Sequence, residues 1–339
     1  MNRDFLNQEK INENLIKKVE EFKEKYEKNL EYENRIGKSH FKYYGKDVWD
    51  QALSALIAGK NLLLVGEKST GKNVLAENLS ELFLRPLWNV SFHVNTDANS
   101  LIGSDTFKNN QVLFRPGPVY LSAVNGGFCV LDEINMAKNE ALSVLHSVLD
   151  YRRIIDVPGY DRIKLSPATR FIGTMNYGYQ GTRDLNEALL SRFAVIKMPT
   201  ISKENLFKLL SNEFTDLKEK YTSQFVDLFM ELKNKCDAGE ISFSVLDLRG
   251  LIDAIDLMKL GLSPLKALNM FITNKSFDQY EKNLIFDALS LRIPKNLNSE
   301  ELFKWLSSVT LVERTILYGM HGALINMSPF INQWTLRAR

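Results

Sequence analysis

The stretch Asn61 to Asn73, NLLLVGEKSTGKN, decides how the rest of the chain is interpreted. Its apolar half is short enough for a buried strand, and the loop after it has glycine at its first and sixth positions. Apolar residues then recur at helical spacing. A strand, a glycine-bearing loop, a lysine and a helix in this order predict a phosphate-binding loop. Loop N–H groups and the helix N-terminus would face the anion, and Lys72 would reach the β- and γ-phosphates.

Asn73 departs from the usual pattern, in which Ser or Thr follows the lysine and binds Mg²⁺ through its hydroxyl. An amide oxygen is a hard, neutral ligand that Mg²⁺ accepts directly or through water, so we expect a variant metal position here. The alternative is an ordinary strand–turn–helix junction with a surface lysine. The expected nucleotide-binding residues of the loop are Gly66, Glu67, Lys68, Ser69, Thr70, Gly71, Lys72, Asn73 and Val74.

The bulk composition is that of a soluble globular protein. The 339 residues suffice for two domains, and 45% are hydrophobic and 25% charged. The chain has 43 basic and 41 acidic residues, so its overall charge does not indicate a strongly basic surface for nucleic acid. A local basic patch is still possible. Two cysteines form neither a disulfide framework nor a metal cluster, which favours the cytoplasm. We expect no membrane span and no signal peptide.

Residues 1–40 are expected to form a charged amphipathic helix followed by a linker. The apolar residues that recur three or four apart are Ile11, Leu15, Val19, Phe22, Tyr26 and Leu30. This stripe either packs on the flank of the next domain or binds a neighbouring subunit. From Asp47 to Ala58 the same spacing predicts a short helix that leads into the strand at Asn61.

A second apolar strand, Gly127 to Leu131, ends in Asp132 and Glu133. Open α/β sheets bind ligands at the carboxyl ends of their strands. Asp132 would hold Mg²⁺ through its water shell, and Glu133 would orient and polarise an attacking water. Two acids after a strand are also common on a plain surface, but Lys72 upstream favours an ATP site.

A further apolar strand ends in Asn176, whose amide could bind both the γ-phosphate and the catalytic water. The alternative is an asparagine that only forms the turn before Tyr177. Between the strands, the polar stretch 93–111 is too long for a tight connection and predicts an insertion that faces a partner. Residues 153–165 alternate apolar and polar side chains on both sides of Pro158-Gly159, which predicts a hairpin or a merely decorative ribbon.

The order of these features resembles the AAA+ ATPases. It comprises the phosphate loop, the Asp-Glu strand, the hairpin, the Thr-Met-Asn strand and Leu-x-Glu-Ala-Leu-x-x-Arg-Phe at 185–193. Phe114 to Pro118 is typical of the MoxR branch, whose relatives serve nitric-oxide reductase, Rubisco activation and gas vesicles. The resemblance covers about residues 41–260.

This resemblance implies an α/β fold in which an αβα P-loop core with a parallel sheet precedes a helical lid. The core would span 41–200, with a helix-2 insertion at 93–111 and a pre-sensor hairpin at 153–165. The lid would span 201–313, and the tail 314–339 lies beyond the resemblance.

Carried over residue by residue, the resemblance makes Gly66 to Asn73 the Walker A loop and Asp132 with Glu133 the Walker B pair. Asn176 matches sensor 1, and Arg192 matches the arginine finger that reaches the nucleotide of a neighbouring subunit. Arg249 resembles the sensor 2 arginine, which contacts the γ-phosphate. The expected catalytic residues are Lys72, Glu133, Asn176 and Arg192, and the expected metal residues are Asn73 and Asp132.

The family resemblance further implies a cytoplasmic ATPase that uses Mg²⁺ and assembles as a ring, a hexamer, to activate or remodel a client. The client or adaptor is often a protein with a von Willebrand A domain. One alternative is a nucleic-acid motor or restriction-type NTPase, against which the near-neutral charge argues. Another is a nucleotide-gated scaffold without turnover, of which Asn73 would be the mark.

Overall fold

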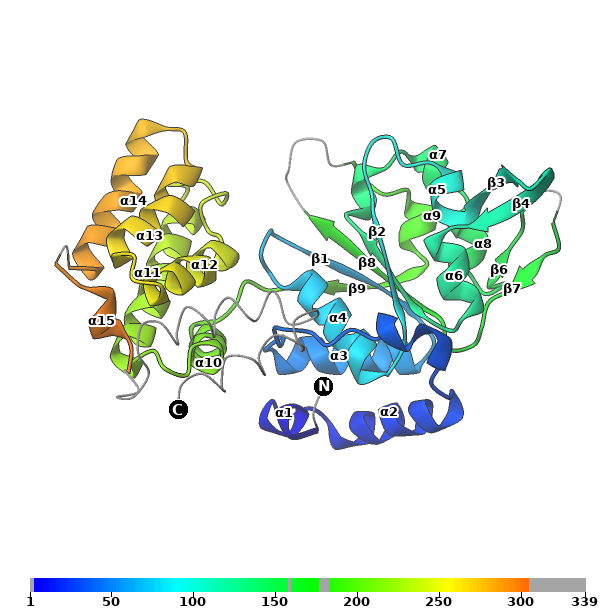
Figure 1. Ribbon diagram of the computed structural model, residues 1–339, viewed down its shortest axis with the longest axis horizontal. Helices are drawn as coiled ribbons and strands as arrows, with labels where there is room; N and C mark the ends of the chain where they lie inside the picture. Colours follow the sequence, from blue (N-terminus) through cyan, green and yellow to red (C-terminus); the bar gives the residue numbers. More distant parts are fainter. Residues whose placement is uncertain (1–2, 158–159, 177–182, 295, 305–339) are drawn as a thin grey trace, which may run out of the picture.

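The structure is a computed structural model that describes residues 3–157, 160–176, 183–294 and 296–304. At its centre lies a five-stranded parallel sheet with the strand order β2-β5-β8-β1-β9. Figure 1 shows this sheet between helices on both faces, with a separate group of helices beside it. The strands are β1 (Asn61–Gly66), β2 (Leu87–Ser91), β5 (Phe128–Asp132), β8 (Arg170–Asn176) and β9 (Phe193–Lys197).

Successive side chains of β1 point to opposite faces of the sheet and enter two different cores. Leu62 and Leu64 pack with α3 (Lys46–Ile57) and α4 (Lys72–Leu82). Leu63 packs on the other face. The elements on that face are α6 (Pro118–Val124), η2 (Ile134–Met136), α7 (Asn139–Leu142), α8 (Leu145–Leu149) and α9 (Glu187–Leu190). The predicted αβα core with a parallel sheet is therefore confirmed, and its central strand is apolar because both of its faces are buried.

The N-terminal stripe folds into three short helices rather than the single helix that its spacing suggested. They are α1 (Arg3–Gln8), α2 (Glu13–Lys25) and the 3-10 helix η1 (Leu30–Arg35). Asn12 caps α2 and Asn29 caps η1, so a new helix begins after each of these two asparagines. Val19 and Phe22 are buried in the chain's own core, whereas Leu30 is exposed. Packing on the flank of the domain therefore accounts for α2.

The insertion expected at 93–111 continues to Pro116. It forms α5 (Ala98–Ile102) and an antiparallel hairpin of β3 (Gly103–Lys108) and β4 (Gln111–Pro116). A second, shorter hairpin pairs β6 (Ile154–Ile155) with β7 (Ile163–Lys164), and its expected turn at 158–159 lies outside the described residues. The hydroxyl of Tyr160 donates to Asp105 Oδ1 at 2.6 Å, so the two hairpins contact each other.

A group of helices follows β9, where we expected the lid. These helices are α10 (Lys203–Glu213), α11 (Glu219–Asp237), α12 (Leu248–Lys259), α13 (Pro264–Phe271), η3 (Thr273–Lys275), α14 (Gln279–Arg292) and α15 (Ser299–Leu302). Ser202 caps α10 through its side chain, but Ser263 makes no such bond to α13, which begins instead at Pro264. Among the described residues, no helix is both long and apolar enough to cross a membrane. The tail 314–339 lies outside the described residues.

Candidate nucleotide-binding site

The loop between β1 and α4 turns its helix N-terminus toward a pocket. Gly71 is the N-cap of α4 at φ 82°, a left-handed conformation that favours glycine. A β-carbon at Gly71 would also come within 3.0 Å of the ring of Tyr43. The first-turn N–H groups of α4 have no intrahelical partner, so they are available to an anion in the pocket.

Lys72 is buried inside this loop, with 8% of the residue exposed. Its ammonium group donates to the carbonyl oxygens of Gly66 (3.0 Å) and Glu67 (2.6 Å). Burial lowers the pKa of Lys72 to about 8, although the charges of Asp132 and Glu133 act in the opposite direction. A buried ammonium in a low-dielectric loop favours a polyanionic partner, which would replace the solvation it has lost.

Asn73 and Asp132 meet across the pocket. The amide nitrogen of Asn73 donates to Asp132 Oδ2 at 3.2 Å, and the hydroxyl of Thr174 donates to Asp132 Oδ1 at 2.6 Å. The amide oxygen of Asn73 is buried and has no hydrogen-bond partner among the described residues. Since buried polar atoms are seldom left unpaired, this oxygen together with the Asp132 carboxylate fits a hard cation such as Mg²⁺.

Glu133 lies at the end of β5 at φ 54°, a left-handed conformation that is uncommon for a non-glycine residue. Its N–H donates to Thr174 Oγ1 at 3.0 Å, which fixes this turn. The side-chain amide of Asn176, at the end of β8, donates to Glu133 Oε1 at 3.0 Å. The structure thus brings the two predicted residues together, with the carboxylate of Glu133 oriented by the amide of Asn176.

A cavity of about 540 Å³ joins these groups to the helical domain. The phosphate loop, the ends of β5 and β8, the segment 41–45, the segment 199–202 and the start of α12 line its walls. Arg249 is among the lining residues, in the first turn of α12. Figure 1 shows the loop after β1 directed toward the helical domain. The cavity is large enough for a nucleotide, with a polar phosphate end and a more apolar end.

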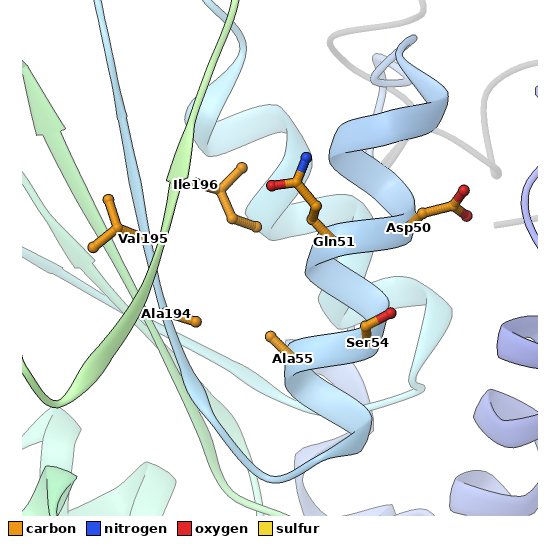
Figure 2. Close-up of a pocket in the computed structure, with 7 residues that line it drawn as sticks. All are labelled: Asp50, Gln51, Ser54, Ala55, Ala194, Val195 and Ile196. Carbon is orange, nitrogen blue, oxygen red and sulfur yellow. The ribbon is translucent and has the colours of Figure 1, made fainter.

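A second hollow, of about 560 Å³, opens between α3 and β9 (Figure 2). Figure 2 shows Ala55 on α3 facing β9, and Val195 on the other side of that strand. Its one charged lining residue, Asp50, already pairs with Lys46 at 2.6 Å. None of the phosphate-loop residues lines this hollow, so it is separate from the candidate site.

Comparison with known proteins agrees with this geometry. Residues 61–193 match the family model described as the AAA domain of the dynein-related subfamily. The uncharacterized protein YojN of Bacillus subtilis is 36% identical over 257 residues, which is 74% of this chain and 84% of YojN. The chain belongs to this AAA family. The uncharacterized protein SAB1265c of Staphylococcus aureus is 34% identical over 258 residues, which is 74% of this chain and 98% of that protein.

A crystal structure from Cytophaga hutchinsonii, of a protein named only as a candidate ATPase, covers 89% of this chain and 96% of its own. At 17% identity and a TM-score of 0.41 it carries no functional information. The AAA domain itself is an ATPase domain with a nucleotide site, and the family model spans the phosphate loop through Phe193.

Arg192 lies away from the pocket of its own AAA domain. It precedes β9 at the amino end of the sheet, where its carbonyl accepts from Asn61, while the phosphate loop follows the carboxyl end of β1. A five-residue strand is roughly 16 Å long, so Arg192 and the phosphate loop lie at opposite ends of the parallel strands. The guanidinium donates to the carbonyl oxygens of His146 (3.2 Å) and Ala188, and lies 3.9 Å from Asp150.

Three residues at the AAA site were not selected from the sequence, namely Tyr43, Thr174 and Asp247. Thr174 carried a signal, because it lies two residues before Asn176 and so points to the same face of β8. Tyr43 lies just before the helix predicted from Asp47, in a stretch where the sequence showed no motif. Asp247 accepts from the Ser69 hydroxyl at 3.3 Å, a contact between residues 178 apart that no local pattern reveals.

Proposed function

We propose that this protein is an ATP-hydrolysing remodelling ATPase that works as a ring on a partner protein. One observation carries the proposal. Lys72, the Asn73–Asp132 pair and the Glu133–Asn176 pair converge on one cavity that also receives Arg249. A cation for phosphates, ligands for a metal and a base for water are the parts that phosphoryl transfer to water requires.

In this mechanism the loop N–H groups and Lys72 bind the β- and γ-phosphates of ATP. Glu133 accepts the proton of the attacking water, and Asn176 holds both that carboxylate and the water in line with the γ-phosphorus. Arg249 contacts the γ-phosphate from the lid. Asn73 and Asp132 would hold Mg²⁺, which neutralises charge on the phosphate oxygens when it is bound.

The place of Arg192 supports the proposal of a ring. The Arg192 guanidinium lies at the amino ends of the strands, whereas the pocket of the same chain lies at their carboxyl ends. Arg192 would therefore act on a nucleotide that is bound by a second copy of the chain. An arginine supplied in this way stabilises the charge of the transition state. The resemblance to the MoxR branch supports a hexamer.

The partner would meet the two hairpins. Phe107, Val112 and Leu113 on β3–β4 are exposed by 71%, 62% and 45%. A two-stranded ribbon that exposes apolar side chains is suited to bind protein. By the same family resemblance, the partner is a client or adaptor, such as a protein with a von Willebrand A domain.

Mg²⁺-dependent ATP hydrolysis over a series of protein concentrations, with molecular mass measured in parallel, tests this proposal. We expect specific activity to rise as the ring forms. Tight ATP binding without turnover at any concentration would instead favour a nucleotide-gated scaffold. DNA binding that falls steeply with salt would favour a nucleic-acid motor.

A further inference from the structure

Asp247 connects the lid to the phosphate loop. The residue is 9% exposed, and its carboxylate accepts from three elements. Oδ1 accepts from the backbone N–H of Arg249 at 3.1 Å, which caps α12, and from the hydroxyl of Ser69 at 3.3 Å. Oδ2 forms an ion pair with Lys275 at the end of η3. One side chain therefore contacts the nucleotide loop, the helix of Arg249 and a second lid segment.

The approach of Lys275 depends on Gly250, in the first turn of α12. A β-carbon there would lie 2.8 Å from the Lys275 ammonium and 2.8 Å from the carbonyl oxygen of Phe271. Glycine thus leaves the space through which the ammonium reaches Asp247. Burial raises the pKa of Asp247, but the hydrogen bond and charge of Lys275 outweigh it and hold the pKa below its usual value. The carboxylate is therefore ionised at neutral pH.

The same carboxylate oxygen receives both the loop and the helix of Arg249. Ser69 lies at φ 63°, a left-handed conformation that a serine adopts only when its surroundings hold it there. Phosphates that enter the loop would act on Ser69 and bring negative charge close to Asp247. A shift of Ser69 then changes the cap of α12 directly, because both bonds share one oxygen.

We propose that Asp247 is a positioning residue that couples occupancy of the phosphate loop to the placement of Arg249, with Lys275 neutralising the carboxylate against the incoming phosphates. This inference rests on the proposed function, since it assumes that the pocket takes a nucleoside triphosphate. The family match covers residues 61–193, so neither Asp247 nor Lys275 lies within it.

Amide hydrogen exchange of the full chain, with and without a non-hydrolysable ATP analogue and Mg²⁺, tests the coupling without turnover. Asp247→Ser keeps a good helix cap but is too short to reach Ser69 and Lys275. In the parent we expect the analogue to slow exchange in α12 about tenfold. In Asp247→Ser we expect binding within about threefold of the parent, because the loop is intact, but no change in α12.

Asp278→Ser is the matched control, because Asp278 caps α14 through Glu281 N–H and makes no contact with the phosphate loop. It should respond to the analogue as the parent does. The inference fails if Asp247→Ser still shows the slowed exchange in α12, or if Asp278→Ser abolishes it equally.

A kinetic cycle gives a second test in the active enzyme. Asp247→Ser and Lys275→Met should each lower kcat about tenfold, as a misplaced catalytic group does. In an Arg249→Ala background, Asp247→Ser should cause no further loss, because it acts through that arginine. Effects that multiply would refute the coupling. A parent without turnover would contradict the proposed ATPase but leave the exchange experiment decisive for Asp247.

Discussion

The loop after β1, which lines the nucleotide pocket, and the two hairpins lie at different ends of the AAA core (Figure 1). The two regions are built in different ways. The pocket has many polar contacts. The Asp132 carboxylate accepts a hydrogen bond from Thr174, and Glu133 is held through both its backbone N–H and its carboxylate. The tip of β3–β4 instead exposes Phe107 and Val112, which pair across the strands without a core beneath them. The pocket residues are therefore held by contacts within the chain, whereas the exposed hairpin tip is open to the proposed partner.

Arg192→Ala tests whether the pocket of one chain can hydrolyse ATP without an arginine from a second chain, and it has the largest expected effect. We expect kcat to fall by about 10³-fold or more, because an arginine finger contributes 10³–10⁵ to such reactions. Mixing this variant with Glu133→Gln chains should restore part of the activity, since a mixed ring contains sites with both groups intact. Arg162→Ala, which removes an exposed arginine paired with Asp156, is the control and should retain full basal activity. An Arg192→Ala protein with parental kcat would show that the pocket works alone.

Glu133→Gln should lower kcat by about 10²–10⁴-fold, the usual contribution of a general base. The amide keeps the shape of the side chain and still accepts from Asn176, so ATP should bind within about threefold of the parent. Steady-state phosphate release and equilibrium binding of a fluorescent ATP analogue measure the two effects. Glu140→Gln on α7 is a matched control at an exposed glutamate. Parental turnover by Glu133→Gln would remove this residue from the chemistry.

Lys72 should make ATP binding depend on pH. The free protein holds the pKa of Lys72 near 8, and bound phosphates favour the charged ammonium, so binding raises that pKa. ATP affinity should therefore be nearly constant from pH 7 to 7.5 and weaken above pH 8, by up to about tenfold per unit. Isothermal titration should show proton uptake at pH 9. In Lys72→Met binding should be weak and flat over this range; a steep decline there would assign the effect to another group.

Most of the predicted site residues line one pocket, because nearly all of them belong to short motifs at the ends of strands. Lys72 with Asn73, Asp132 with Glu133, and Asn176 each follow a strand, and parallel strands bring their carboxyl ends together. The sharing of Asp132 between Asn73 and Thr174, and of Asp247 between Ser69 and Lys275, depends on how distant segments pack. The spacing of apolar residues in the sequence does not predict contacts of this kind.

The β3–β4 hairpin escaped prediction for a different reason. Strands are recognised by a buried face that alternates with a polar one, and this ribbon has almost no buried face. One signal was present but unused. Asn109 and Asn110 both have positive φ, the conformation of a type I′ two-residue turn, and Lys108 pairs with Gln111 around them. The two adjacent asparagines were therefore the sequence signal of this turn.

Substitution at the hairpin tip gives the smallest expected effect and tests the other half of the comparison. Phe107→Ser and Val112→Ser remove exposed side chains, so the free energy of unfolding should change by no more than about 0.5 kcal/mol. Leu64→Ala in β1, where the side chain is fully buried, should cost about 2–5 kcal/mol. Chemical denaturation compares the three. Basal ATP hydrolysis by the two hairpin variants should also stay within about twofold of the parent, because neither Phe107 nor Val112 lines the pocket. If Phe107→Ser lowered the free energy of unfolding as much as Leu64→Ala does, the tip would have to pack against the chain itself. The proposal that the hairpin binds a partner would then be contradicted.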